Sequence, residues 1–299
     1  MTPANARSHR EDTAWRGDRA AMFVLSFDVD AESVIWAIGR RYAEHPMTMS
    51  HQTYGPTVGV PRILDLLDEY NLKATFFVPG QTADLYPACV ENIVTAGHEV
   101  GHHSYSHRSP CGMSDAEERQ DFERAMTSLD RLGVKPVGYR AAMWDPSWRS
   151  ADLVAEHGLL YDSSLMDDDR PYVIETSHGE IAELPPHWSL DDWLQYFYLP
   201  DPAMGQNIES GDKVYDLWRG ELDGMRRHNC LFMLTNHPFI SGRPGRVETL
   251  RRLVEHAIGC GDVGFATAAE VARRVLGDAK APRRKPTQAV VDEGAYPVH

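Results

Sequence analysis

The sequence predicts a mixed α/β fold in which parallel strands alternate with helices. Short apolar runs, typical of strands covered on both faces, recur along the chain, and amphipathic segments with helical spacing separate them. This alternation over most of the length indicates βα units, arranged as a barrel or as an open doubly wound sheet. With 299 residues, 42% of them hydrophobic, the chain can bury a large core.

In the first half, the first predicted strand is residues 22–27, an almost continuous apolar run. A helix over 60–70 follows, with apolar residues at helical spacing and Pro61 in its first turn, where proline is tolerated. The next elements are strand 74–78, helix 83–96 ending at Gly97, a short strand over 98–101, and a helix that opens with the capping box Ser114/Glu117.

The second half continues the alternation. Its predicted elements are strand 137–141, helix 149–157, strand 159–161, helix 215–227, strand 231–235, helix 247–258, strand 263–267 and helix 268–276. The segment from residue 277 is rich in proline and basic residues, which favours an exposed tail. We therefore expect an N-terminal extension over 1–20, one barrel domain over 21–276 and a tail over 277–299.

Composition restricts the classes of partner. Acidic residues outnumber basic ones by 44 to 30, and the net charge of −14 disfavours nucleic acid and anionic membranes as partners. The first twenty residues are polar and no run of eighteen apolar residues occurs, so we expect a cytoplasmic protein. The four cysteines are widely spaced and indicate neither a disulfide framework nor a thiolate zinc site.

Three polar clusters come directly after predicted strands. They are Asp28-Val29-Asp30, His103-x-x-x-His107 and Asn236-His237. In a βα barrel the carboxyl ends of the strands form the face that carries the active site. Two histidines and a carboxylate are ligands expected for a catalytic divalent ion such as zinc, so we predict Asp30, His103 and His107 as a metal site. A lone histidine pair is more often a surface coincidence, but three clusters at strand ends make coincidence the weaker explanation.

These residues resemble a known family. Ser26-Phe-Asp-Val-Asp30, His103-Ser-Tyr-Ser-His107, Tyr139-Arg140 and Leu234-Thr-Asn-His237-Pro238 are similar to the ordered motifs of the NodB-homology, or polysaccharide deacetylase, superfamily, over about residues 20–275. The resemblance implies an irregular (β/α)7 barrel open at one seam. It further implies that Asp28 is the general base, that Asp30, His103 and His107 bind a divalent metal, most often Zn2+, that His237 is the general acid, and that Arg140 orients Asp28.

The motifs also depart from those of secreted sugar deacetylases. Val29 separates the two aspartates, and Arg140 is followed by Ala-Ala-Met-Trp instead of x-Pro-Tyr. This pattern is more similar to the branch with cyclic imide hydrolases, cofactor-free allantoinases and some deacetylases named for peptidoglycan. We therefore expect hydrolysis of a non-peptide carbon–nitrogen bond in a small cyclic imide, ureide or N-acyl compound. The alternatives are N-deacetylation of an N-acetylglucosamine-containing glycan and a metal-stabilised barrel that binds a ligand without turnover.

Aromatic and acidic residues are concentrated between 161 and 198. We expect Trp144, Trp188, Asp191, Asp192 and Trp193 to form the substrate wall, although tryptophans of this kind also pack in cores or at subunit contacts. A homo-oligomer whose contacts complete the pocket is compatible with the pattern. Asp162 is a candidate partner of His237, whereas His98 and His102 are expected to have structural roles.

Overall fold

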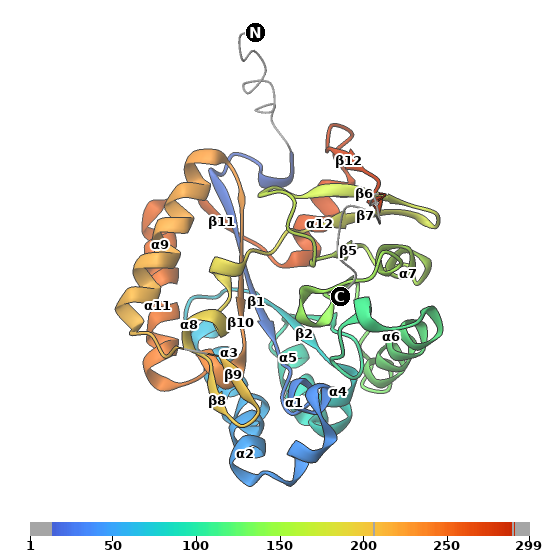
Figure 1. Ribbon diagram of the computed structural model, residues 1–299. Coiled ribbons are helices and arrows are strands. Elements are labelled where there is room, and N and C mark those ends of the chain that lie inside the picture. Colours follow the sequence, from blue (N-terminus) through green and yellow to red (C-terminus); the bar gives the residue numbers. More distant parts are fainter. Residues whose placement is uncertain (1–13, 206, 289, 291–299) are drawn as a thin grey trace.

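The computed structural model describes residues 14–205, 207–288 and 290. Within these residues a ten-stranded sheet has the order β10-β1-β2-β3-β4-β5-β7-β6-β12, with β11 also paired to β1 (Figure 1). Its strands are β1 (Ala21–Asp28), β2 (Thr75–Val78), β3 (Glu99–His102), β4 (Gly138–Tyr139), β5 (Tyr161–Asp162), β6 (Tyr172–Thr176), β7 (Gly179–Glu183), β10 (Leu231–Asn236), β11 (Val263–Phe265) and β12 (Arg283–Arg284). A separate antiparallel pair consists of β8 (Tyr198–Pro200) and β9 (Ala203–Gly205).

Helices connect these strands and cover the outside of the sheet. They are α1 (Ser33–Ile38), α2 (Pro46–Tyr54), α3 (Val60–Glu69), α4 (Gly80–Leu85), α5 (Pro87–Thr95), α6 (Asp115–Asp130), α7 (Ser150–Glu156), α8 (Trp193–Tyr196), α9 (Gly211–His228), α10 (Pro238–Ser241), α11 (Pro244–Cys260) and α12 (Ala268–Leu276). In Figure 1, α9 and α11 lie on one side of the central strands and α6 and α7 on the other. No helix among the described residues is long and apolar enough to cross a bilayer.

Strand pairing confirms the predicted α/β class. Every ladder of the large sheet is parallel except that between β6 and β7, a hairpin. β1 lies at the centre of the sheet. It pairs with β10 along most of its length, with β11 at its beginning and with β2 at its end. The described strands form an ordered row from β10 to β12, so the curved sheet is not closed by a continuous ladder. This is compatible with the irregular barrel that was expected.

The main core lies between the central strands and the helices that cover them. Phe23 and Phe232 of neighbouring strands make an edge-to-face contact at 4.7 Å, and Trp218 of α9 is fully buried in the same cluster. Each fully buried side chain of this size contributes roughly 1.5–3 kcal/mol through removal of apolar surface from water. The strands that end at the polar clusters are therefore held rigidly by apolar packing.

Several elements differ from the sequence prediction. The segment between residues 33 and 59 contains α1 and α2, which were not predicted. The helix expected over 83–96 is two helices, because Pro87 begins α5 and removes a backbone donor at the junction. The β6–β7 hairpin was also not predicted as strands.

Both chain ends extend the packed domain beyond its predicted limits. Trp15, in the expected N-terminal extension, is 1% exposed and packs in a cluster with residues of α12, while residues 1–13 of that extension lie outside the described residues. At the other end, Arg283 and Arg284 of the expected tail form β12, which pairs with β6. These two residues are therefore paired with the sheet, although the described residues from 282 onward are mostly exposed.

Gly138 in β4 provides a stability prediction. A Cβ atom at this position would lie 1.9 Å from ring atoms of Tyr161, whose hydroxyl donates to Glu99 Oε1. Gly138→Ala must displace this buried ring, so we expect a loss of about 1–3 kcal/mol in unfolding free energy and a Tm lower by several degrees. Gly220→Ala in α9, where nothing lies within 4 Å, is the control. A Tm for Gly138→Ala equal to that of the control would contradict the prediction.

Candidate active site

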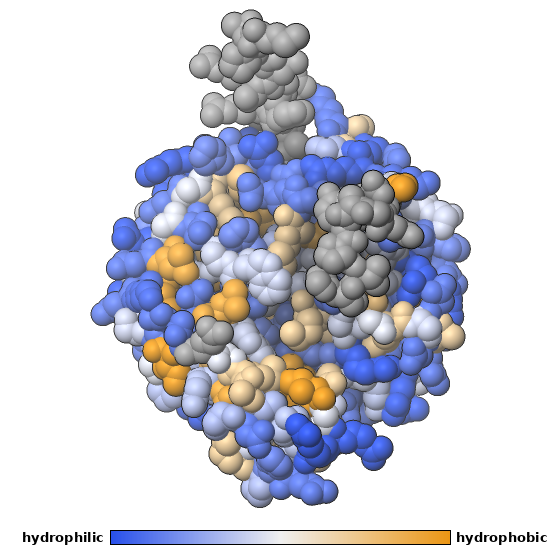
Figure 2. All heavy atoms as spheres, in the orientation of Figure 1, coloured by the Kyte–Doolittle hydropathy of each residue, from blue (hydrophilic) through white to orange (hydrophobic). Residues whose placement is uncertain are grey.

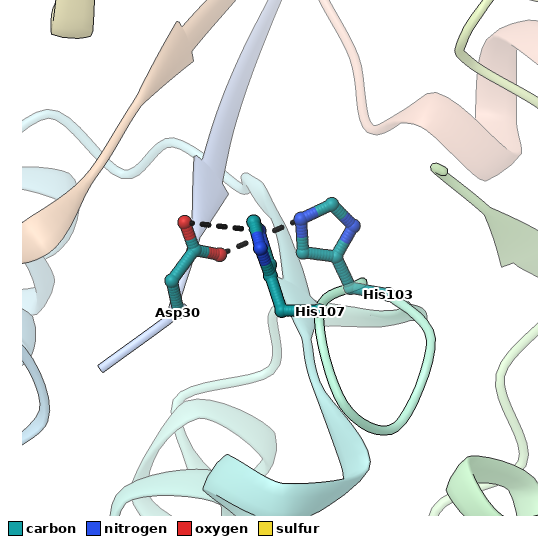
Figure 3. A group of neighbouring side chains, drawn as sticks. All are labelled: Asp30, His103 and His107. Atoms are coloured by element: carbon teal, nitrogen blue, oxygen red, sulfur yellow. Dashed lines mark ion pairs between the residues drawn. The ribbon is translucent and has the colours of Figure 1, made fainter. Parts of the chain in front are cut away.

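The three polar clusters meet at the carboxyl ends of their strands. Asp28 is the last residue of β1, and His103 and His237 directly follow β3 and β10. The Asp30 carboxylate lies between imidazoles: its Oδ1 is 3.4 Å from His103 Nε2, and its Oδ2 is 3.3 Å from His107 Nε2 (Figure 3). His237 Nε2 is 3.5 Å from the same Oδ2. Residues up to 209 positions apart, Asp28 and His237, thus share one buried site.

Local backbone conformation turns the two predicted ligand histidines toward Asp30. Ser104 and His107 both have positive φ, at 59° and 56°, so the chain after β3 folds back within four residues. The Asp30 carbonyl accepts hydrogen bonds from Ser33 Oγ at 2.6 Å and Thr82 Oγ1 at 2.9 Å, which fix the loop after β1. The site is therefore formed by tight loops on rigid strands.

The protonation of His103 is determined by a backbone contact. Its Nδ1 lies 2.8 Å from the carbonyl oxygen of Arg140, which can only accept, so Nδ1 carries the proton. The lone pair of the neutral ring is then on Nε2, which faces Asp30. A ligand histidine oriented by a hydrogen bond from its other nitrogen is the usual arrangement in metal sites.

These side chains fit a divalent cation. Both carboxylate oxygens of Asp30 are buried and accept no hydrogen bond from the described residues, which is costly for an isolated charge. Burial would raise the pKa of Asp30, but the imidazoles of His107, His103 and His237 lower it well below its ordinary value, so the group is a carboxylate. The ligand atoms of Asp30, His103 and His107 all lie within 4.8 Å of one another. One carboxylate and two imidazoles suit Zn2+.

Asp28 is held by a buried ion pair. Arg140, which is fully buried, donates from Nη1 to Asp28 Oδ1 at 2.7 Å and to Ser26 Oγ at 3.0 Å. The guanidinium also lies 4.1 Å from the centre of the Phe77 ring. The other carboxylate oxygen, Oδ2, is 3.8 Å from His103 Nε2, on the side of the ligand cluster. Arg140 is thus placed to orient Asp28, as the family resemblance implied.

His237 is paired with Asp192 and not with Asp162, which corrects the prediction. Asp192 Oδ1 accepts from His237 Nδ1 at 2.7 Å, and its Oδ2 accepts from the His237 backbone N–H at 2.9 Å. Asp162 instead accepts from Ser163 N and Ser164 Oγ. Burial would lower the pKa of His237, but Asp192, Asp191 and Asp30 raise it to about 10.

We expect Asp192→Asn to shift the alkaline limb of the kcat/KM profile to lower pH. If the imidazolium of His237 is the proton donor, as the family resemblance implies, removing the Asp192 charge removes the largest contribution that raises its pKa. The variant therefore loses activity at a pH at which the wild type is still protonated. The pH–rate profiles of both proteins, with Asp162→Asn as the control, test this. An alkaline limb that moves in the control but not in Asp192→Asn would contradict the assigned pair.

A largely apolar cavity of about 170 Å3 opens above the polar groups. Its walls include Met143, Trp144, Trp188, Trp193 and Leu194, and the rings of Trp144 and Trp188 are 4.9 Å apart. Met143, Trp188 and Leu194 remain about half exposed at the rim, on a molecule whose face in Figure 2 is mainly hydrophilic. Met143 and Trp144 have consecutive positive φ values, which turn the loop after Arg140.

Most residues of the predicted substrate wall thus lie together around the cavity. Trp144, Trp188, Asp191 and Trp193 line the cavity, whereas Asp192 is fully buried in its contact with His237. Asp191 Oδ1 accepts from Trp193 N at 2.8 Å, and burial raises the pKa of Asp191 to about 7. Sequence analysis missed Met143 and Leu194, whose only signal was their position beside the tryptophans.

The remaining histidines near this face have structural contacts. His102 stacks on Phe122 at 4.0 Å and its Nε2 contacts the Phe122 carbonyl. His98 Nδ1 accepts from the backbone N–H of Ala74. Neither residue contributes to the ligand cluster, as predicted.

Comparisons with known proteins agree with this geometry. The family model for polysaccharide deacetylase matches residues 51–161. A solved structure from Mycobacterium smegmatis, named as a polysaccharide deacetylase, is 42% identical, covers 97% of this chain and 100% of that one, and has a TM-score of 0.89. The peptidoglycan deacetylase of Helicobacter pylori is 28% identical over 89% of this chain and 100% of its own length. The Puue allantoinase structure, at 22% identity, 93% and 98% coverage and a TM-score of 0.79, shares the fold.

Proposed function

Because this chain belongs to the polysaccharide deacetylase family, we propose that it is a metal-dependent hydrolase of a non-peptide carbon–nitrogen bond. The observation that carries the proposal is that three sets of side chains with different chemical properties meet at one cavity. Asp28 is a carboxylate held by Arg140, Asp30, His103 and His107 form a ligand set, and His237 is a protonated imidazole held by Asp192. A barrel that only bound a ligand would need neither the ion pair nor the protonated histidine.

The residues of the chain have separate roles in this proposal. Asp30, His103 and His107 would hold a divalent ion, which would supply Lewis acidity toward water and the amide carbonyl. Asp28 accepts the proton of the attacking water, since its ion pair with Arg140 leaves Oδ2 directed toward the ligand cluster.

His237 supplies the proton that the departing nitrogen needs, because an amide nitrogen is a poor leaving group as an anion. Asp192 holds the Nδ1 side of the ring, so the proton on Nε2 is the one that faces the site. The pKa of about 10 keeps this proton in place at neutral pH. The acid is thus in its working protonation state before the substrate binds.

The cavity supports a small substrate as the leading proposal. Its volume of about 170 Å3 and its tryptophan walls suit a compact, flat molecule such as a cyclic imide or ureide, or a short N-acyl compound. The similarity to a peptidoglycan deacetylase over nearly the whole chain supports the second candidate, N-deacetylation of an N-acetylglucosamine-containing glycan.

Parallel assays of the Zn2+-reconstituted protein distinguish the two candidates. One assay measures acetate release from an N-acetylglucosamine oligomer, and the other measures opening of a five- or six-membered cyclic imide, each with His103→Ala as the control. Ring opening alone supports the small-molecule substrate, and acetate release alone supports the glycan. If the metal-loaded protein hydrolysed neither compound nor any of a panel of other amides, the hydrolase proposal would be wrong.

A further inference from the structure

We propose that the chain has a second metal site, at which Asp223, His256 and Cys260 bind a thiophilic divalent ion such as Zn2+. The three residues come from α9 and α11, which lie side by side on the outside of the molecule in Figure 1. None of them lines the active-site cavity. The inference is independent of the proposed hydrolase function.

The spacing along α11 places two ligands on one face. His256 and Cys260 are four residues apart, so their side chains point the same way from consecutive helical turns. Asp223 projects toward them from α9. The wide spacing of the cysteines in the sequence gave no sign of this arrangement, because the third ligand is 33 residues from His256.

Two of the three separations between ligand atoms are close to the edges of a tetrahedral site. His256 Nε2 is 3.1 Å from Asp223 Oδ1 and 3.7 Å from Cys260 Sγ, and all three atoms lie within 4.8 Å of one another. Zinc bonds of about 2.0 Å to nitrogen and oxygen and 2.3 Å to sulfur give edges of roughly 3.3 and 3.5 Å. A single proton on Nε2 can be donated to only one of its two neighbours, whereas a cation interacts with all three.

Charge at the site also favours a cation. Arg226 donates to Asp262 through Nε at 2.8 Å and Nη2 at 3.1 Å, so Asp262 largely neutralises its guanidinium. Its third bond, from Nη1, reaches only Oδ1 of Asp223, and no described residue donates to Oδ2. The side chains of Asp223 and His256 are 27% and 24% exposed, which leaves a path for the ion and a position for water. Three protein ligands and an open position are a usual zinc arrangement.

Cobalt substitution tests the proposal because Co2+ bound by a thiolate has a charge-transfer absorption that nitrogen and oxygen ligands do not produce. The active-site cluster contains no cysteine, so the band reports only the second site. We expect the Co2+-loaded wild type to show the band and to bind two ions per chain. Cys260→Ser should lose the band and one ion. The matched control is Cys111→Ser, which removes an exposed cysteine and should change neither.

Two further variants complete the test. His256→Ala should weaken binding at this site at least about tenfold, whereas His103→Ala should leave the cobalt–thiolate band intact. Circular dichroism of each variant confirms that it is folded. A wild type without the band, or a band that persists in Cys260→Ser, would overturn the proposal. Because hydrolysis is not the readout, failure here says nothing against the proposed active site.

Discussion

Replacement of His103 by alanine is expected to abolish both metal retention at the active site and amide hydrolysis. His103 is one of the three proposed ligands, and its loss leaves the buried Asp30 carboxylate with one proposed ligand imidazole, that of His107, and the protonated His237. A metal ion contributes several kcal/mol to transition-state stabilisation, so kcat/KM should fall by about a thousandfold or more.

The experiment is cleanest in a Cys260→Ser background, which removes the proposed second site from the ion count. Metal content per chain and kcat/KM are then measured together, with His178→Ala, a change at an exposed histidine on the β6–β7 turn, as the control. Full metal content and activity in His103→Ala would show that the ligand set is wrongly assigned.

Asp28→Asn is expected to lower kcat by about 10²- to 10⁴-fold while the metal content stays normal. Asparagine has nearly the same shape, and its carbonyl oxygen can still accept the hydrogen bond from Arg140 Nη1, but it cannot take a proton from water. The change therefore removes the proposed base without removing the proposed ligands.

Asp162→Asn is the matched control, since Asp162 is also a buried carboxylate near Arg140 but does not line the cavity. Activity, metal content and thermal stability are compared for both variants. If Asp28→Asn kept its activity with normal metal content, another group would have to be the base.

The proximity of Asp30, His103 and His107 could be predicted from the sequence because these residues lie just beyond the ends of neighbouring strands. Asp30 lies two residues after β1, His103 follows β3, and parallel strands bring their carboxyl ends to one edge. Position along the chain was therefore sufficient to place them, without knowledge of side-chain packing.

The partner of His237 could not be predicted in this way. Asp192 and Asp162 both lie in the acidic, aromatic part of the chain, and only the path of the loop after β7 decides which carboxylate reaches the imidazole. In the structure a bridge between Asp191 and Thr235 aligns this loop with the end of β10, which places Asp192 against His237. Such pairings depend on tertiary packing, for which spacing in the sequence contains no signal.

Dependence on tertiary packing, and the shortness of some elements, also explain the errors in the predicted fold. α1 and α2 lie in a segment where polar and apolar residues do not follow a clear helical period, so packing and not intrinsic pattern determines them. β12 has only two residues, which is too short for a strand pattern, whereas β4 and β5 were expected but are shorter than predicted. Long periodic elements such as α11 and the buried β10 were predicted.

Arg140 contacts two parts of the site through two different groups. Its guanidinium holds Asp28, while its backbone carbonyl holds His103. Every amino acid supplies a carbonyl at this position, but arginine alone supplies the fork of donors. Substitution at position 140 can therefore remove the hydrogen bond to Asp28 and keep the backbone contact with His103. In evolutionary terms, a single codon change there would remove the contact that holds Asp28 and would keep the backbone contact that orients His103.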